Sequence, residues 1–440
     1  MSSIFLHIDY NSYFATVEQQ ANPRLRGKPI GVTGGDRMER TVVGAASVEA
    51  KALGIKTGMS IQEARRIYPQ LILVRGDSDK YLACTKRFIN ILKDYSPYLE
   101  IFSIDEAFVQ LPQPASFEDG IEIAMQIKER IHKEIGDWLR VSIGVSYNKT
   151  MAKLAGSLQK PDGLYVIADE QAAQMILDQI EFDDICGIGH ATKRHLFNMG
   201  ITNFPTLRKV PRELLISAFK SYGMFLYNIA RGIHDNPLVA FYDKEEVKSV
   251  GHQHTLRRDT NDPEKIQQTL LKMSEMVAKR LRDKGLMTRT VVCFFRYALG
   301  HSEGIEEDSS VYRRQGFVDV EIQKWQQAGR VHFESAGMQI TIFPTDDGLS
   351  IFKAAWRVFS QMWDREAVRL LGISTTNLVA KKDQTLSLLP EAKRTEVITK
   401  TLDLVNDRYG DFVLRRGVLL KSGDMRRKPN SFLSDRRFKI

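Results

Sequence analysis

Two short apolar runs that meet at an adjacent pair of acids constrain this chain more than any other feature. They form the stretch Tyr98-Leu-Glu-Ile-Phe-Ser-Ile-Asp105-Glu106-Ala-Phe-Val-Gln-Leu111. The β-branched and aromatic residues predict two strands, with Asp105 and Glu106 where the strands turn. A third apolar run, Ile4 to Ile8, ends at Asp9. Because hard divalent cations need several oxygen ligands, the sequence predicts a metal site on Asp9, Asp105 and Glu106.

An adjacent pair of acids in a turn has a simpler interpretation. Taken alone, such a pair is usually a solvated loop tip. The metal site is favoured because all three acids lie at the ends of apolar runs, in a chain that also carries features typical of nucleic-acid binding.

Composition limits the class of protein and of partner. The 440 residues predict three or four domains, and 43% hydrophobic with 27% charged residues is ordinary for a soluble globular protein. The formal charge of +9 favours a polyanionic partner, which could be DNA, RNA or a membrane surface. The three cysteines, Cys84, Cys186 and Cys293, form no metal-binding or disulfide pattern. With no signal segment and no apolar run long enough for a membrane span, we expect a cytoplasmic protein.

A glycine-containing turn predicts contact with a nucleic-acid backbone. In Ile185-Cys-Gly187-Ile-Gly189-His-Ala-Thr192 the two glycines precede an expected helix, as in a helix-hairpin-helix. The glycines let the backbone approach a phosphate, and the amides at the helix start bind that charge without reading sequence. The alternative is a plain turn between helices.

Three motifs in the first 111 residues resemble, in order, the catalytic core of the Y family of DNA polymerases, the translesion enzymes. They are Ile8-Asp-Tyr-Asn-Ser-Tyr-Phe14, Glu49-Ala-Lys-Ala-Leu-Gly-Ile-Lys-Thr-Gly-Met59 and Ser103-Ile-Asp-Glu-Ala107. The resemblance implies error-prone synthesis across damaged template, without proofreading and as part of a DNA-damage response. It also implies two Mg²⁺ ions on Asp9, Asp105 and Glu106, with primed template DNA and a deoxynucleoside triphosphate as substrates.

The resemblance further implies an α+β multidomain fold arranged as a right hand. We expect a palm over residues 1–18 and 80–167, fingers over 19–79, and a helical thumb over 168–236. A linker over 237–246 leads to a βα little finger over 247–378, and a basic tail fills 379–440. The little finger is expected to hold two helices over strands that include 312–322.

The opening motif and two lysines are the expected nucleotide-binding residues. Asn11 or Ser12 can cap a helix whose free amides would face the triphosphate. By resemblance, Phe14 is a steric gate whose ring leaves no room for a 2′-hydroxyl; the alternative for Tyr13 and Phe14 is an aromatic core position. Lys51 stands where relatives often have arginine, and Val48 where they often have tyrosine. The expected nucleotide-binding set is Tyr10, Asn11, Ser12, Tyr13, Phe14, Lys51 and Lys160.

DNA contacts are expected from four further positions. These are the thumb glycines Gly187 and Gly189, and Lys248 and Ser249 at the start of the little finger. Such contacts predict salt-dependent, sequence-blind affinity. Lys149 and Lys153 are expected either to contact DNA or to be solvated.

The C-terminal region resembles two features of bacterial relatives. Gln384, Leu386, Leu388 and Leu389 resemble a sliding-clamp motif, with one extra residue after the glutamine and a leucine in place of the aromatic residue. Residues 412–440 carry nine basic and two acidic residues. Arg415-Arg-Gly-Val and the basic end resemble the catalytic subunit of polymerase V more than polymerase IV, which leaves open an accessory mutagenesis subunit.

Two other classes stay open at this point. One is a non-catalytic DNA-binding scaffold that has kept the fold, against which the three intact acids argue. The other is a two-metal nucleotide cyclase, against which the expected helix-hairpin-helix and the basic C-terminal half argue.

Overall fold

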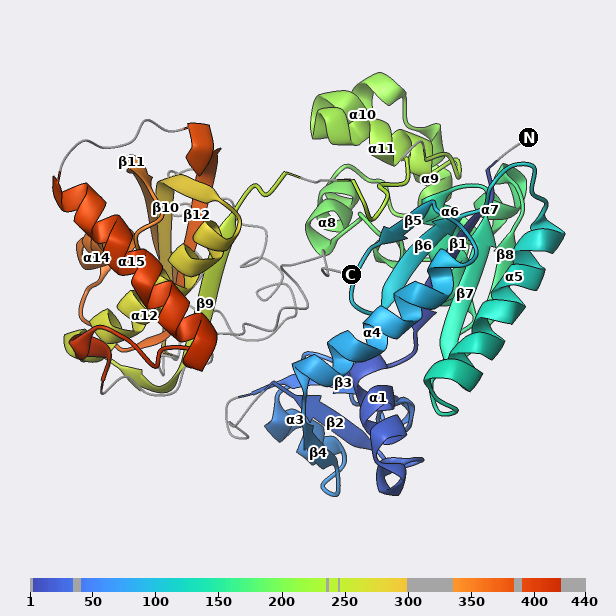
Figure 1. The fold of residues 1–440 in the computed structure, drawn as a ribbon. Helices are drawn as coiled ribbons and strands as arrows, with labels where there is room; N and C mark the ends of the chain where they lie inside the picture. The colour runs from blue at the N-terminus through green and yellow to red at the C-terminus, as the bar shows by residue number, and fades with distance from the viewer. Residues whose placement is uncertain are drawn as a thin grey trace. The chain divides into compact units, whose positions relative to one another are not determined.

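The computed structural model of the chain describes residues 3–34, 41–234, 237–243, 246–298, 335–383 and 390–420. These residues divide into two compact units, one within residues 3–243 and one within residues 246–420. Figure 1 shows the elements of each unit. The expected strand at 312–322 and the expected clamp motif at 384–389 lie outside the described residues.

A five-stranded sheet in the first unit carries the three predicted acids. Its order is β5-β6-β1-β7-β8, with β1 antiparallel to both β6 and β7, and β7 parallel to β8. β1 is central, and all its residues except Asp9 are buried, which explains its nearly unbroken apolar sequence. The strands are β1 (Phe5–Tyr10), β5 (Leu99–Ile101), β6 (Glu106–Gln110), β7 (Val141–Ser146) and β8 (Leu164–Ile167).

Helices cover both faces of this sheet. A Cβ added at Gly120 of α5 (Phe117–Arg130) would lie 2.9 Å from the Val145 side chain. A Cβ added at Gly144 would lie 2.0 Å from the Ala152 carbonyl oxygen in α6 (Lys149–Leu158). Since neighbouring residues of a strand point to opposite faces, α5 and α6 lie on opposite sides of β7. Both glycines are therefore required by close helix packing. A third helix, α4 (Ser78–Lys93), contacts α5 and β5.

A smaller sheet follows the first helix of the chain. Its order is β3-β2-β4, from β2 (Ile30–Thr33), β3 (Val43–Ala46) and β4 (Ile72–Arg75). The helix α1 (Tyr13–Ala21) contacts β2, β3 and α4, so it joins the small sheet to the large one. Two short helices, α2 (Val48–Ala52) and α3 (Ile61–Ile67), begin at the caps Ser47 and Ser60, whose side chains accept backbone N–H bonds.

A helical region completes the first unit, with Phe182, Leu196, Phe204 and Leu226 in its core. The predicted glycine turn precedes α8, and a second glycine-containing turn, Ser221-Tyr-Gly223, begins α11. Gly187 has a left-handed φ of 108°, and its carbonyl accepts a hydrogen bond from the Tyr222 hydroxyl. The two turns therefore lie side by side. The helices are α7 (Glu170–Leu177), α8 (His190–Asn198), α9 (Phe204–Lys209), α10 (Arg212–Phe219) and α11 (Ser221–Ile229).

The second unit is an antiparallel four-stranded sheet with two long helices. The strand order is β11-β10-β12-β9. The helices pack on one face, because the inward residues of β10, Val291, Cys293 and Phe295, are fully buried with α12 and α14. The elements are β9 (Val250–Thr260), α12 (Pro263–Asp283), β10 (Leu286–Tyr297), β11 (Ser335–Thr345), α14 (Gly348–Met362) and β12 (Val368–Ala380).

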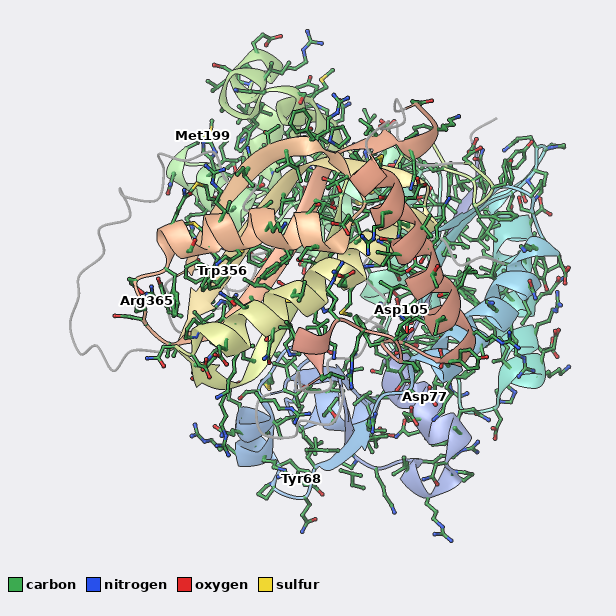
Figure 2. The ribbon with its side chains drawn as sticks, turned by 60° about the vertical axis from the view of Figure 1, so that its left-hand side comes forward. Tyr68, Asp77, Asp105, Met199, Trp356 and Arg365 are labelled. Atoms are coloured by element: carbon green, nitrogen blue, oxygen red, sulfur yellow. The ribbon has the colours of Figure 1, made fainter. Side chains whose placement is uncertain are left out.

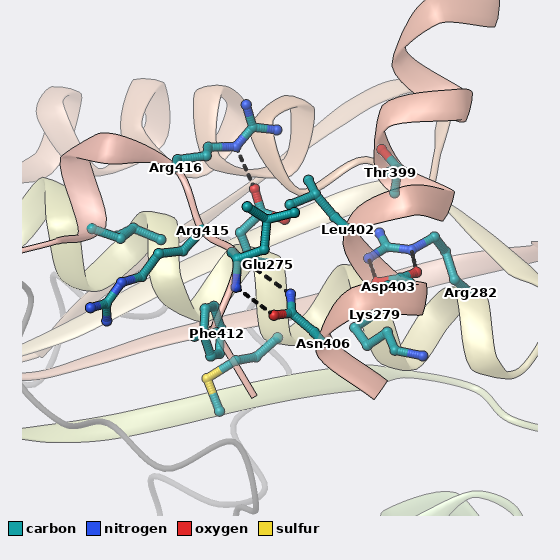
Figure 3. Close-up of a pocket in the computed structure, with 13 residues that line it drawn as sticks. Glu275, Lys279, Arg282, Thr399, Leu402, Asp403, Asn406, Phe412, Arg415 and Arg416 are labelled. Carbon is teal, nitrogen blue, oxygen red and sulfur yellow. Dashed lines mark hydrogen bonds and ion pairs between the residues drawn. The ribbon is translucent and has the colours of Figure 1, made fainter. Parts of the chain in front are cut away.

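A further helix within the expected basic tail packs on this second unit. Figure 3 shows α15 (Pro390–Tyr409) beside α12, where Arg282 donates to both oxygens of Asp403 at 2.6 and 2.9 Å. Asn406 holds the returning segment by two hydrogen bonds of 2.9 Å with the backbone of Leu414. Residues 390–420 therefore pack against α12 of the second unit, in a region where the sequence had predicted no helix.

Most expected elements agree with the structure within a few residues. The helix α5 is followed directly by a π-helical turn over Ile131–Ile135. Neither β4 nor β8 had been expected as a strand. None of the described helices has both the length and the apolar character that crossing a bilayer requires.

Candidate active site

The structure brings the predicted acids together at one end of the large sheet. Asp9 is directly opposite Glu106 in the β1–β6 pairing. The backbone N–H of Tyr10 donates to the carbonyl of Asp105 at 3.0 Å. Asp9 and Asp105 also line the same pocket. Asp105 is labelled in Figure 2. Residues almost one hundred positions apart in the chain therefore form one acidic cluster.

Two basic side chains hold Glu106 ionised. His7 Nε2 lies 2.9 Å from Glu106 Oε2, and the Lys153 ammonium is paired with the same oxygen. Burial opposes ionisation, but the hydrogen bond from His7 and the charge of Lys153 outweigh it and lower the pKa of Glu106 to about 2. Burial also lowers the pKa of His7, so His7 is a neutral donor. One oxygen of Glu106 is thus engaged by protein.

Asp105 has the opposite electrostatic environment. Burial is the main cause that raises the pKa of Asp105 to about 6, and the charges of Asp9 and Glu106 act in the same direction. The Ser103 hydroxyl, at 2.5 Å from Asp105 Oδ1, opposes this rise. Without a cation, Asp105 therefore gains a proton as the pH falls through about 6, well above the usual range of an aspartate.

A pocket beside the acids is lined by all seven predicted nucleotide-binding residues. Its walls are formed by residues of the β1–α1 turn, β3, α2 and the 160–163 turn. Ser12 is the N-cap position of α1 but makes no side-chain cap, and its buried hydroxyl has no partner among the described residues. The expectation of a capped helix was therefore wrong. The lining residues are Asp9 to Phe14, Gly44 to Ala46, Val48, Lys51, Thr57, Asp105, Lys160 and Pro161.

The aromatic residues of the opening motif divide into two groups. Tyr10 and Tyr13 are almost fully buried, with ring centroids 5.0 Å apart, so the core position expected as an alternative for Tyr13 is correct. Phe14 is half-buried and stacks on Tyr81 with centroids 4.6 Å apart. The Tyr81 hydroxyl donates to Glu18 at 2.7 Å. The ring of Phe14 thus lines the pocket, and the hydrogen-bonded Tyr81 ring on which it stacks holds it in place.

The two predicted phosphate lysines both line the pocket. Lys160 Nζ lies 2.7 Å from Asp9 Oδ1. Much of the Lys51 side chain is exposed, yet partial burial of its ammonium, followed by the charge of Lys160, lowers the pKa of Lys51, while Asp9 and Asp105 act in the opposite direction. Val48 is 40% exposed at the position where relatives often have tyrosine.

Lys149 and Lys153 are neither solvated nor free. Lys149 is buried and lies 2.6 Å from Glu100, while Lys153 is paired with Glu106. The solvated alternative was therefore wrong for Lys149, while contact of these lysines with DNA stays a prediction.

The predicted DNA-binding residues belong to elements other than those that carry the acids. Gly187 and Gly189 are exposed in the turn before α8. Lys248 and Ser249 are exposed just before β9, in the second unit. Gln384, Leu386, Leu388 and Leu389 lie outside the described residues.

Sequence reasoning missed His7, Tyr81 and Ser142 as parts of the site. His7 had a usable signal, because it is the polar residue of an apolar run and shares a strand face with Asp9. Tyr81 and Ser142 had none, since each lies in an ordinary helix or strand pattern far along the chain.

Two family models match the chain. Residues 8–157 match the impB/mucB/samB family, and residues 247–388 match the impB/mucB/samB family C-terminal domain. A DNA polymerase IV of Pelotomaculum thermopropionicum is 33% identical over 94% of this chain and 94% of its own length. DNA polymerase IV 1 of Bacillus subtilis is 31% identical over 99% and 97%, respectively. A solved Y-family DNA polymerase chimera, Dbh-Dpo4(243-245)-Dbh, has a TM-score of 0.66 at 25% identity, over 86% of this chain and 99% of that chain.

The chain belongs to the Y family of DNA polymerases, the translesion enzymes, as the resemblance implied. The expected α+β multidomain architecture is confirmed, and its sheets and helices are consistent with palm, fingers, thumb and little-finger domains. The two curated relatives are called polymerase IV. The matching family model is described as impB/mucB/samB, and this description is compatible with the expected likeness to the polymerase V subunit.

Proposed function

We propose that this protein extends a primer across damaged template DNA by two-metal nucleotidyl transfer, with Asp9, Asp105 and Glu106 as the ligands of two Mg²⁺ ions. The observation that carries the proposal is the meeting of the three carboxylates beside a pocket lined by Lys51 and Lys160. Carboxylate oxygens are the donors that Mg²⁺ prefers. The donor set therefore fits the ions that the family requires.

The protein groups have distinct roles in this proposal. When bound, the ions supply the charge that activates the primer 3′-hydroxyl and stabilises the pyrophosphate leaving group. Lys51 and Lys160 offset triphosphate charge, and the Ser12 hydroxyl, which has no partner within the described part of the chain, is available to a phosphate oxygen. Tyr10 to Tyr13 bring the start of α1 to the triphosphate, and Phe14 excludes a 2′-hydroxyl.

The other predicted partners remain part of the proposal. Gly187, Gly189, Lys248 and Ser249 would hold the DNA backbone, and Gln384, Leu386, Leu388 and Leu389 a sliding clamp. We also propose that the palm, fingers, thumb, linker and little finger follow the boundaries expected from the sequence. We further propose a cytoplasmic enzyme of the SOS response that works without proofreading and with an accessory mutagenesis subunit.

Primer extension on a primed template tests the catalytic part. We expect extension with Mg²⁺ and none after chelation. Asp105→Ala should abolish extension while leaving DNA binding within about threefold of the wild type, because one rim carboxylate contributes little to backbone affinity. A non-catalytic scaffold would bind DNA without extending it. Extension by Asp105→Ala at the wild-type rate would remove the metal assignment.

A further inference from the structure

Asn11 has a buried side chain whose hydrogen bonds reach two distant parts of the chain. It follows Tyr10 directly after β1 and is 6% exposed. Its Nδ2 donates to Ser142 Oγ at 3.0 Å, and its Oδ1 accepts from the backbone N–H of Asp162 at 2.7 Å. Ser142 Oγ also accepts from the N–H of Gly163 at 3.3 Å. Asn11 therefore does not cap α1 but joins β7 to the 160–163 turn.

The 160–163 turn depends on such external bonds. Asp162 has a left-handed φ of 59°, a region that residues other than glycine seldom adopt. Lys128 donates to the carbonyl of Gly163 at 3.3 Å and pairs with Asp162 Oδ1 at 3.0 Å. Arg140 lies 3.6 Å from the other carboxylate oxygen of Asp162. Lys128 and Arg140 thus hold the turn by its Asp162 carboxylate and Gly163 carbonyl. Asn11 holds it from the β1–α1 side, by the Asp162 backbone N–H.

Lys160 extends from this turn into the pocket. Its ammonium reaches Asp9 Oδ1 at 2.7 Å, although its side chain is 40% exposed. A flexible lysine stem keeps an ammonium at one place only if the backbone that carries it is fixed. Asn11 is itself fixed, since its backbone N–H donates to Arg140 O at 2.9 Å and its carbonyl accepts from Thr16 Oγ1 at 2.6 Å.

We infer that Asn11 is a positioning residue for triphosphate binding: its side chain holds the 160–163 turn so that Lys160 faces the pocket beside Asp9. This rests on the proposed role of Lys160 in nucleotide binding. Both polar atoms of the Asn11 side chain are engaged by protein, so its effect on the nucleotide is exerted through Lys160 rather than by direct contact.

Single-nucleotide insertion by the full-length enzyme on primed DNA tests the inference. We expect Asn11→Ala to raise the KM for the deoxynucleoside triphosphate about tenfold with a much smaller change in kcat, because one buried hydrogen-bond network is lost. The Kd for the nucleotide, measured on enzyme bound to a dideoxy-terminated primer, should rise by the same factor. Asn11→Asp should restore both within about threefold, since a carboxylate accepts from Asp162 N–H and from the Ser142 hydroxyl.

Asn148→Ala is the matched control. Asn148 is 7% exposed, accepts from Met151 N–H at 2.9 Å and donates to Gly232 O at 2.9 Å, away from the pocket. It should lower stability as Asn11→Ala does, without the selective rise in KM. Equal kinetics for the two variants would overturn the inference. If Asn11→Ala does not fold, Ser142→Ala is tested in its place. It keeps Asn11 but removes one of its two partners and the bond from Gly163 N–H, so it should also raise the nucleotide Kd.

A double variant separates this inference from the proposed function. The double variant Asn11→Ala/Lys160→Ala should bind nucleotide no worse than Lys160→Ala alone. Both substitutions remove the same contribution, the contact of the Lys160 ammonium with the triphosphate, so their effects should not add. An additive loss would overturn the inference while Lys160 keeps its role. If Lys160→Ala leaves the nucleotide Kd unchanged, the role of Lys160 and the inference fail together.

Discussion

At the scale of single residues, Asp105 and Glu106 show how neighbours in sequence acquire different chemistry. Glu106 faces His7 and Lys153, and its pKa is held at about 2. Asp105 is half-buried beside Asp9 and Glu106, and its pKa is raised to about 6. Because a metal ligand must lose its proton, a cation bound by the proposed ligands would displace a proton mainly from Asp105.

This difference predicts pH-dependent metal affinity. As the pH falls below about 6, Asp105 of the metal-free protein gains a proton. The affinity for Mg²⁺ or Mn²⁺ should then fall by up to about tenfold per pH unit, and it should level off above pH 7. Metal titration calorimetry at pH 5.0 and 7.5 measures the effect. Asp105→Asn should bind metal weakly at both values. Equal wild-type affinity at the two pH values would contradict the assignment of Asp105.

The stacked ring of Phe14 predicts sugar discrimination. Phe14→Ala should raise the ratio of ribonucleotide to deoxyribonucleotide insertion, in kcat/KM, on the order of 10- to 100-fold, because the space under the sugar is opened. Phe197→Ala, a phenylalanine of α8 that is 41% exposed, is a control that should leave the ratio unchanged. An unchanged ratio in Phe14→Ala would reject the gate.

At the scale of elements, residues at the start of α6 form hydrogen bonds with the chain just after α11, where it leaves the helical region of the first unit. Tyr147 and Asn148 both donate to Gly232 O, at 2.8 and 2.9 Å. Glu100 accepts from Lys149 at 2.6 Å and from Val239 N–H at 2.8 Å. The backbone of Phe241 also donates to Leu99 O at 2.8 Å. Much of the segment expected as a linker is therefore bound along β5.

The buried pair among these contacts predicts a large loss of stability. Lys149→Met should lower the free energy of unfolding by about 3 kcal/mol, because it leaves the Glu100 carboxylate without its buried partner. Lys133→Met removes the exposed pair with Glu129, whose side chains are 68% and 62% exposed, and should cost less than about 0.5 kcal/mol. Urea unfolding of the full chain compares them. Equal losses would show that burial does not strengthen the Lys149 pair.

At the scale of the whole molecule, positive charge is concentrated at the C-terminal end. The net charge is +9, and residues 421–440 carry seven basic and two acidic residues. Each phosphate that a basic side chain neutralises releases counterions and adds to the salt dependence of DNA binding. Net charge therefore supports affinity for any DNA sequence rather than for one site.

Removal of residues 421–440 should weaken DNA binding and flatten its salt dependence. We expect the slope of log K against log salt to fall by about 0.9 for each phosphate that the shortened protein no longer neutralises. Fluorescence anisotropy from 50 to 300 mM salt measures it, and a tail with its seven basic residues changed to glutamine is the matched control. Two duplexes of unrelated sequence should give equal affinities. Identical slopes with and without the tail would exclude it from DNA binding.

The sequence by itself determined the acids, the family and most elements of the fold. The apolar runs that end at Asp9 and at Asp105 are local patterns. A strand that is buried in a sheet requires such a run of apolar residues in its own sequence. Motif order then identified the family. These features depend on neighbouring residues, so they can be predicted without knowing which strands pair.

Only the tertiary structure decided what holds the site in place. His7 meets Glu106 across 99 positions, Asn11 meets Ser142 across 131, and Lys160 meets Asp9 across 151. The order β5-β6-β1-β7-β8 brings these residues together, and no local periodicity encodes the order of strands in a sheet. The same order buries Lys149 and pairs Lys153 with Glu106, whereas the charges of these lysines alone had indicated solvent or DNA.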